Sequence, residues 1–186
     1  MAKVLKTFNV KHFCAPKVTH NTRTFENMIK EVKKKGLKVE VLKAGTGDKF
    51  DLGKGAKVEV FSPNKDSYDN LNNYSPIMKF TFGENSFLFT GDAEKEVERE
   101  VLERGFNIDS DVLKTGHHGS HSSSSEEFIK AVSPKIAIMS LATHNKYGHP
   151  HKETIETFKK FGVKTYQTNL DGDIVLESDG HNITKK

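Results

Sequence analysis

The 186-residue sequence has one cysteine, no tryptophan and no long apolar run. Cys14 alone makes an internal disulfide impossible. No apolar stretch approaches the roughly 20 residues that a membrane-spanning helix needs. Residues 1–4 open directly into ordinary sequence, so no signal peptide is visible. A G-x-S-x-G nucleophile turn is also missing, which argues against a serine hydrolase built around Ser120.

The composition predicts one soluble globular domain that spans residues 1–186. The chain is long enough to bury a sizeable core. A formal charge of +4 implies only a mild attraction for polyanions. The lysines between Lys30 and Lys38 are interpreted as a solvated helix face rather than a nucleic-acid stripe. The aromatic–basic interleaving of single-strand binders is absent.

Strand-like and helix-like patterns alternate along the chain, which predicts an α/β fold. Two antiparallel hairpins, one before residue 90 and one at the C-terminal end, favour mixed sheets over purely parallel ones. Helices are expected at residues 22–35, 92–104, 124–132 and 152–161. Strands are expected at residues 7–13, 37–42, 57–61, 77–82, 86–89, 110–115, 135–140, 163–168, 173–177 and 182–184.

Three expected strands each deliver a carboxylate or imidazole at or beyond their C-terminal ends: Asp92, the pair His117 and His118, and His149. Open α/β sheets place ligands at these ends, and Asp and His suit a hydrolytic metal site. Asp92 and His118 lie 26 positions apart, about one helix plus one strand. That spacing returns the chain to the same sheet edge, where both side chains can share a metal.

Structural alternatives remain open for each of these residues. Asp92 could cap the helix that follows it, and a single histidine at a strand exit is usually a packing residue. Two adjacent histidines point in different directions, so one can bind a metal while the other faces substrate. His121 is interpreted as solvent-exposed rather than as a ligand, and for His144 and His151 a structural role is favoured over a functional one.

Three segments in this order, FLFTGD at 87–92, VLKTGHHGS at 112–120 and NKYGHP at 145–150, resemble the metallo-β-lactamase superfamily. Within it they are most similar to the hydrolase domain of ComEC-type competence (DNA-internalisation) proteins and small stand-alone relatives. The segment LNNYS at 71–75 fits the same branch.

The resemblance implies an αββα sandwich with a metal site along one edge. Asp92 would be a metal ligand that bridges two ions, and His118, or alternatively His117, would bind the second ion. His117 and His149 would be catalytic, with His149 donating a hydrogen bond to a substrate phosphate. Zinc or manganese would be the cofactor, and a phosphoester or nucleic acid the substrate.

The superfamily's H-x-H-x-D-H metal motif is absent from this sequence, and His12 and His20 have the wrong spacing and no aspartate. We therefore predict a partial αββα sandwich that lacks its N-terminal strands, with weak or no activity of its own. The uncovered sheet would expose apolar surface or pair with a second copy in a homodimer. The alternative function is a non-catalytic module, of degenerate metallo-β-lactamase fold, that binds DNA or a partner. Localisation stays open, because a parent protein could be extracytoplasmic or membrane-attached even though this chain makes no membrane contact.

Overall fold

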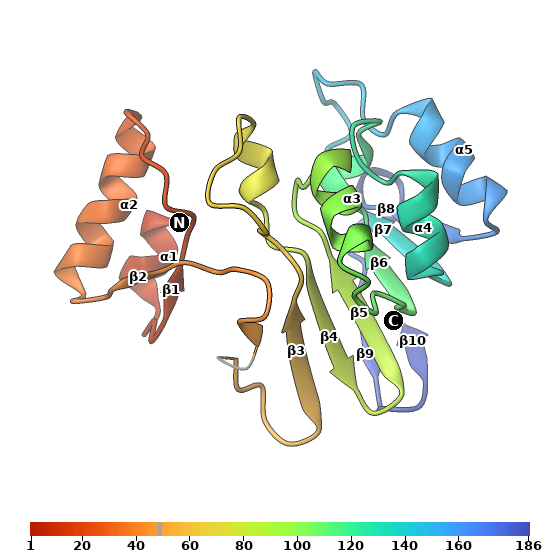
Figure 1. Ribbon diagram of the computed structural model, residues 1–186, viewed down its shortest axis with the longest axis horizontal. Coiled ribbons are helices and arrows are strands. Elements are labelled where there is room, and N and C mark those ends of the chain that lie inside the picture. Colours follow the sequence, from red (N-terminus) through yellow and green to blue (C-terminus); the bar gives the residue numbers. More distant parts are fainter. Residues whose placement is uncertain (48–49) are drawn as a thin grey trace. The chain divides into compact units, whose positions relative to one another are not determined.

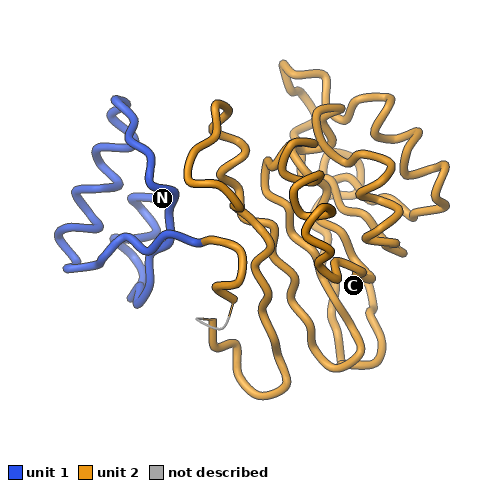
Figure 2. Tube along the Cα trace, viewed as in Figure 1, with its two compact units in different colours: residues 1–42 blue, residues 43–186 orange. Residues whose placement is uncertain are grey.

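The computed structural model describes residues 1–47 and 50–186 (Figure 1). The chain forms two compact units, Met1–Leu42 and Lys43–Lys186 (Figure 2). None of the helices in the described ranges is long and apolar enough to cross a membrane. The single domain expected over residues 1–186 stays a prediction.

The first unit is a small α/β arrangement around Leu5, Phe13 and Val32, which are buried together. Its elements are α1 (Ala2–Thr7), β1 (Phe13–Cys14), α2 (Arg23–Lys34) and β2 (Val39–Glu40), with β1 and β2 parallel. The predicted helix α2 is confirmed. Its N-cap is Thr22, whose hydroxyl accepts a hydrogen bond from the Phe25 N–H at 3.3 Å.

The strand expected at residues 7–13 is wrong over most of its length. Thr7 ends α1, and only Phe13 of this stretch enters a strand. The weak alternation came partly from Phe8, which is 62% exposed. An apolar residue that faces solvent gives the period-two pattern of a half-buried strand without the burial that would stabilise one.

The second unit is built on a six-stranded sheet with the order β3-β4-β5-β6-β7-β8. The first two pairings are antiparallel and the last three are parallel, so the predicted mixed α/β sheet is confirmed. The strands are β3 (Ala56–Val60), β4 (Met78–Phe82), β5 (Asn85–Phe89), β6 (Val112–Lys114), β7 (Ile136–Met139) and β8 (Lys164–Gln167).

Three helices cover one face of this sheet: α3 (Lys95–Glu103), α4 (Glu126–Val132) and α5 (Lys152–Lys160) (Figure 1). Leu88, Leu113 and Ala137 are aligned across β5, β6 and β7 and are fully buried. They belong to one core with Phe128 and Phe158 from the helices. This core fixes the strand ends, and therefore the loops that follow them.

The opposite face of the sheet carries exposed apolar side chains. Cross-strand register places Phe80 beside Phe87 and Met78 beside Phe89 on this face. Phe89 is 45% exposed, and Phe82 is 39% exposed. Exposed apolar area of this kind commonly marks a contact surface.

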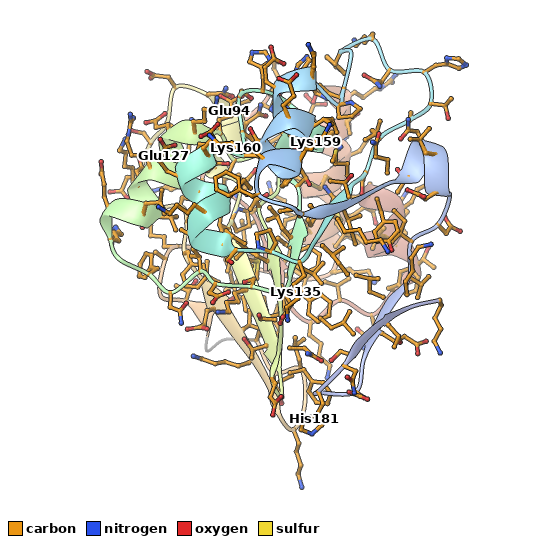
Figure 3. The ribbon with its side chains drawn as sticks, turned by 90° about the vertical axis from the view of Figure 1, so that its right-hand side faces the viewer. Glu94, Glu127, Lys135, Lys159, Lys160 and His181 are labelled. Carbon is orange, nitrogen blue, oxygen red and sulfur yellow. The ribbon has the colours of Figure 1, made fainter. Side chains whose placement is uncertain are left out.

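A C-terminal hairpin of β9 (Leu176–Ser178) and β10 (Ile183–Lys185) contacts the same face where β5 begins, at Asn85. Asn85 donates to the His181 carbonyl oxygen at 3.1 Å, and Ser178 donates to the Asn85 side chain at 2.6 Å. In Figure 3, Glu94 and His181 mark opposite ends of this unit. Within the described residues, short helical segments also lie at Leu71–Tyr74 (3₁₀) and at Thr168–Asp171 (α6), and a tight turn with non-helical dihedral angles at its centre spans Gly116–Gly119.

Candidate active site

The parallel strands β5, β6 and β7 end at one edge of the sheet, and the four predicted site residues lie together there. Asp92 Oδ1 is 3.5 Å from His118 Nε2. The His149 ring centroid is 5.6 Å from that of His117 and 6.4 Å from that of His118. Three loops that are distant in sequence thus contribute to one cluster, which we call the carboxyl edge.

A hydrogen bond from its backbone N–H holds Asp92 in place, so the side-chain carboxylate is available for a ligand. Its N–H donates to Ser75 Oγ at 3.1 Å. Gly91 before it has φ +54°, and a Cβ there would lie 2.8 Å from the Ser75 Cβ, so the turn requires glycine. The helix α3 begins at Lys95 with Glu94 as its N-cap. The alternative that Asp92 caps this helix is therefore wrong.

His117 and His118 both have left-handed backbone conformations, with φ values of 44° and 57°. Each such residue costs about 1–3 kcal/mol and persists only where the surroundings enforce it. The His117 N–H donates to the Gly91 carbonyl oxygen at 3.0 Å, which joins this turn to the Asp92 turn. Strain of this kind clusters at functional sites, and here it directs two adjacent imidazoles toward the carboxyl edge.

The His118 ring is oriented by a backbone carbonyl. Its Nδ1–H donates to the Ser140 oxygen at 2.5 Å, because a carbonyl can only accept. In the neutral ring, Nε2 therefore carries the lone pair, and Nε2 is the atom that faces Asp92. This is the outer-shell arrangement that orients metal-binding histidines.

His117 has a carboxylate and a hydroxyl beside its Nδ1. Ser122 Oγ donates to Glu94 Oε1 at 3.0 Å and lies 3.3 Å from His117 Nδ1. Because the Ser122 hydrogen is directed to Glu94, the Ser122 oxygen is free to accept from His117 Nδ1–H. Glu94 Oε1 itself lies 3.4 Å from Nδ1. The His117 Nε2 atom is left for substrate or proton transfer.

Glu98 connects the segment that follows Asp92 to the segment that follows His118. Its carboxylate is buried and accepts the backbone N–H groups of Ser124 and, at 2.9 Å, Ser125. Burial raises the pKa of this carboxyl above its usual value, although the two N–H groups oppose that shift. Glu98 is on the helix that follows Asp92, and the serines follow His118. The buried carboxylate therefore fixes these two loops relative to each other.

His149 is positioned by Asn145. The Asn145 side chain accepts the His149 N–H at 2.9 Å and donates to the His149 carbonyl oxygen at 2.8 Å. Burial lowers the pKa of His149, and positive charge on the neighbouring histidines lowers it further. A neutral ring at pH 7 can donate one hydrogen bond and accept another.

This pKa shift predicts that the His149 ring titrates below 6.5 in the folded chain. Because the folded pKa is the lower one, the stability that neutral His149 contributes is full above pH 6.5. It is lost as the pH falls through 6.5 toward the folded value. NMR titration of the ring, with the same ring in the urea-unfolded chain as reference, measures both values. A folded midpoint at or above the unfolded one would contradict the prediction.

Two further histidines lie beside this cluster. His121 is exposed, as expected, but its Nδ1 is 2.8 Å from His151 Nδ1, and its backbone N–H donates to that same nitrogen at 3.0 Å. The His151 ring centroid is 4.8 Å from that of His149. His144 is exposed on the preceding loop. His151 is thus a neighbour of the site, and His121 contacts it.

Comparison with known proteins decides the family. Residues 1–144 match the metallo-beta-lactamase superfamily. The chain belongs to this superfamily. The matched range includes Asp92, His117 and His118, and it covers most of the chain.

Among relatives, the metallo-beta-lactamase domain is 34% identical over 171 residues to ComE operon protein 3 of Bacillus subtilis, covering 92% of this chain and 22% of that protein. It is 34% identical over 119 residues to Competence protein ComA of Neisseria gonorrhoeae, covering 63% and 17%. It is 32% identical over 120 residues to Recombination protein 2 of Haemophilus influenzae, covering 64% and 15%. The chain is a metallo-beta-lactamase domain related to ComEC-type competence proteins, and the segments that it matches make up 15–22% of these relatives' length.

The donors at the carboxyl edge are of the type that binds a divalent metal ion, as proteins of this superfamily typically do. Asp92 and His118 supply an oxygen and an oriented nitrogen, which suit a divalent ion. In the described part of the chain, no group of three histidine, cysteine or acidic side chains is placed to hold a metal ion. Two protein ligands leave the remaining positions to water or to other polypeptide.

Several residues that shape the site were not among the predicted ones. Glu94, Glu98 and Ser122 act through hydrogen bonds, and Asn73 accepts the Glu94 N–H at 3.1 Å. The segment LNNYS, which carried part of the family resemblance, did give a signal, since it supplies both Asn73 and Ser75. A buried glutamate on an amphipathic helix has no distinguishing pattern, because its partners are backbone groups 26 and 27 positions away.

Proposed function

We propose that the carboxyl edge is one half of a divalent-metal site that hydrolyses phosphodiesters, with nucleic acid as the substrate. One observation carries this proposal: the His118 Nε2 lone pair faces Asp92 Oδ1 at 3.5 Å while Ser140 fixes the ring's other nitrogen. Zinc and manganese both suit an aspartate and a histidine. A bound ion would polarise a phosphoryl oxygen and lower the pKa of water.

The other residues of the edge have separate tasks. His149, neutral at pH 7 and fixed by Asn145, donates a hydrogen bond to a phosphate oxygen. His117 presents Nε2 to the reacting groups, and Glu94 stabilises the imidazolium that forms if this ring takes a proton. Both rings lie within 5.6 Å of each other by centroid. One phosphate group can therefore contact both.

We further propose that the domain is a partial αββα sandwich. The six-stranded sheet has helices on one face, while its other face exposes Phe82 and Phe89 and, among the described residues, is contacted by the two-stranded β9–β10 sheet at Asn85. Further strands, from other polypeptide or from a second copy in a homodimer, would cover this face and complete the ligand set. On its own the chain would then be a weak or inactive hydrolase.

The names of the relatives support nucleic acid as the substrate. One is a competence protein and another a recombination protein. We extend this to a role in DNA uptake. The rival function is a non-catalytic module of the same fold that binds DNA or a partner.

Metal titration by calorimetry separates these two functions. The 186-residue chain should bind zinc or manganese weakly, and His118→Ala should reduce the affinity by more than the roughly 10–100-fold that loss of an outer-shell partner costs. His144→Ala, which changes an exposed histidine outside the cluster, should leave the affinity unchanged. Absence of binding, or equal losses in both variants, would favour the non-catalytic module.

A further inference from the structure

The two units of this chain carry opposite formal charge. Residues 1–42 hold ten lysines and arginines and three glutamates, which gives +7. Residues 43–186 hold 19 basic and 22 acidic residues, which gives −3. The overall charge of +4 therefore conceals a strongly basic unit of 42 residues.

All ten basic side chains of Met1–Leu42 are exposed. Among the described residues, Lys6 is the one of these ten with a carboxylate within 4.0 Å, at 3.5 Å from Glu31. Lys35 donates to the Phe8 carbonyl oxygen at 2.8 Å. Of the three acidic residues, Glu40 contacts His12 at 2.9 Å. Most of the positive charge is thus presented to solvent without an opposing charge.

Helix stability accounts for only part of this charge. Lys33 and Lys34 lie in the last turn of α2, where their positive charges interact favourably with the negative end of the helix dipole. That effect is confined to the terminal turn. It does not explain Lys11 or Lys17, which are outside any helix, or Arg23 at the opposite end of α2. These charged residues belong to a folded unit with its own core of Leu5, Phe13 and Val32, and not to an unstructured tail.

We propose that Met1–Leu42 is a docking surface for the phosphate backbone of nucleic acid, which replaces the interpretation of Lys30 to Lys38 as merely a solvated helix face. This inference rests on the proposed phosphodiester hydrolysis, since the unit with the carboxyl edge has net negative charge and would repel a polyanion. A basic unit in the same chain offsets that repulsion and raises the local concentration of substrate. Without aromatic residues interleaved among the lysines, binding would be electrostatic and independent of sequence.

Fluorescence anisotropy with a labelled single-stranded oligonucleotide tests the surface directly. EDTA is present throughout, so the result does not depend on metal binding or catalysis. The test variant combines Lys11→Glu, Lys33→Glu and Lys34→Glu. The control combines Lys54→Glu, Lys130→Glu and Lys159→Glu, which are exposed and include two last-turn helix positions in the other unit.

The wild-type chain should bind with an affinity that falls linearly with the logarithm of salt concentration. The test variant should lose about 10-fold or more in affinity, and its salt slope should shrink by about 2 if three phosphate contacts are removed. In the control variant, the change in log Kd should be less than about half of the change in the test variant, because the control charges lie outside the surface. Equal losses in the two variants, or binding that ignores salt, would overturn the proposal.

Two further arms keep the outcome interpretable. If the glutamate variant does not fold by circular dichroism, the variant with glutamine at the same three positions replaces it, with about half the effect expected because charge is removed rather than reversed.

Vesicles containing phosphatidylserine test the membrane as an alternative. Vesicle binding lost in the test variant, with oligonucleotide binding intact, would overturn the proposal. Hydrolysis of bis(p-nitrophenyl) phosphate should be the same in wild type and test variant, so a failure of the catalytic proposal is seen separately.

Discussion

Replacing Asp92 with alanine is expected to abolish the slow, metal-dependent phosphodiester hydrolysis of this chain. The Asp92 carboxylate faces the one lone pair that His118 presents, and it is the only carboxylate that the described structure places within 4.0 Å of that ring. Its loss leaves a single protein ligand. Activity against bis(p-nitrophenyl) phosphate should fall to the background of buffer with metal, and calorimetry should detect no saturable zinc or manganese binding.

The same change should hardly affect stability, which makes the result interpretable. The Asp92 backbone N–H makes the bond to Ser75, and alanine retains that N–H. The side chain is 43% exposed, and surface substitutions usually alter stability by about 0.5 kcal/mol or less. Asp92→Asn, which keeps the shape but removes the charge, should lose activity to a similar extent. Retained activity in Asp92→Ala would exclude Asp92 as a ligand.

Replacing Glu98 with alanine should cause the largest loss of stability among the polar residues near the site. The change strands two buried backbone N–H groups, those of Ser124 and Ser125, and each unsatisfied donor costs about 1–3 kcal/mol. A total of about 2–6 kcal/mol is a large share of the 5–15 kcal/mol typical of a domain. Urea unfolding measures it, with Glu103→Ala on the exposed side of the same helix as the control.

Glu98→Gln separates folding from site geometry. The amide still accepts one of the two N–H groups, so the chain should fold with a smaller loss of stability. Metal affinity should nevertheless fall, because the loop after His118 is less firmly held against the helix after Asp92. Unchanged metal affinity in a folded Glu98→Gln chain would show that Glu98 serves stability alone.

The clustering of the candidate site residues could be predicted from the sequence because it follows strand order. Asp92 and His117 come soon after an apolar strand and His149 lies in the loop after the next one, and parallel pairing of β5, β6 and β7 brings the strand ends together. The mixed sheet and most helices followed from apolar periodicity and from glycine and proline positions. These patterns are local, so one sequence is enough to find them.

The supporting contacts could not be predicted because they depend on packing. The left-handed conformations of His117 and His118, the Ser140 carbonyl at His118 and the Glu98 bonds arise only once the loops are assembled. The division of charge between the two units could not be assigned from the sequence, because the unit boundary near Leu42 is set by the fold. The charge became informative only when the fold assigned ten exposed cations to one small unit.

The central claim is that Asp92 and His118 form half of a hydrolytic metal site. Phosphodiester hydrolysis by the purified 186-residue chain with saturating zinc or manganese tests it most directly, compared with the same chain joined to an upstream superfamily segment that carries H-x-H-x-D-H. The account predicts slow, EDTA-sensitive turnover by the chain alone and a large gain on joining, abolished by Asp92→Ala. Robust turnover by the chain alone, or no gain on joining, would contradict it.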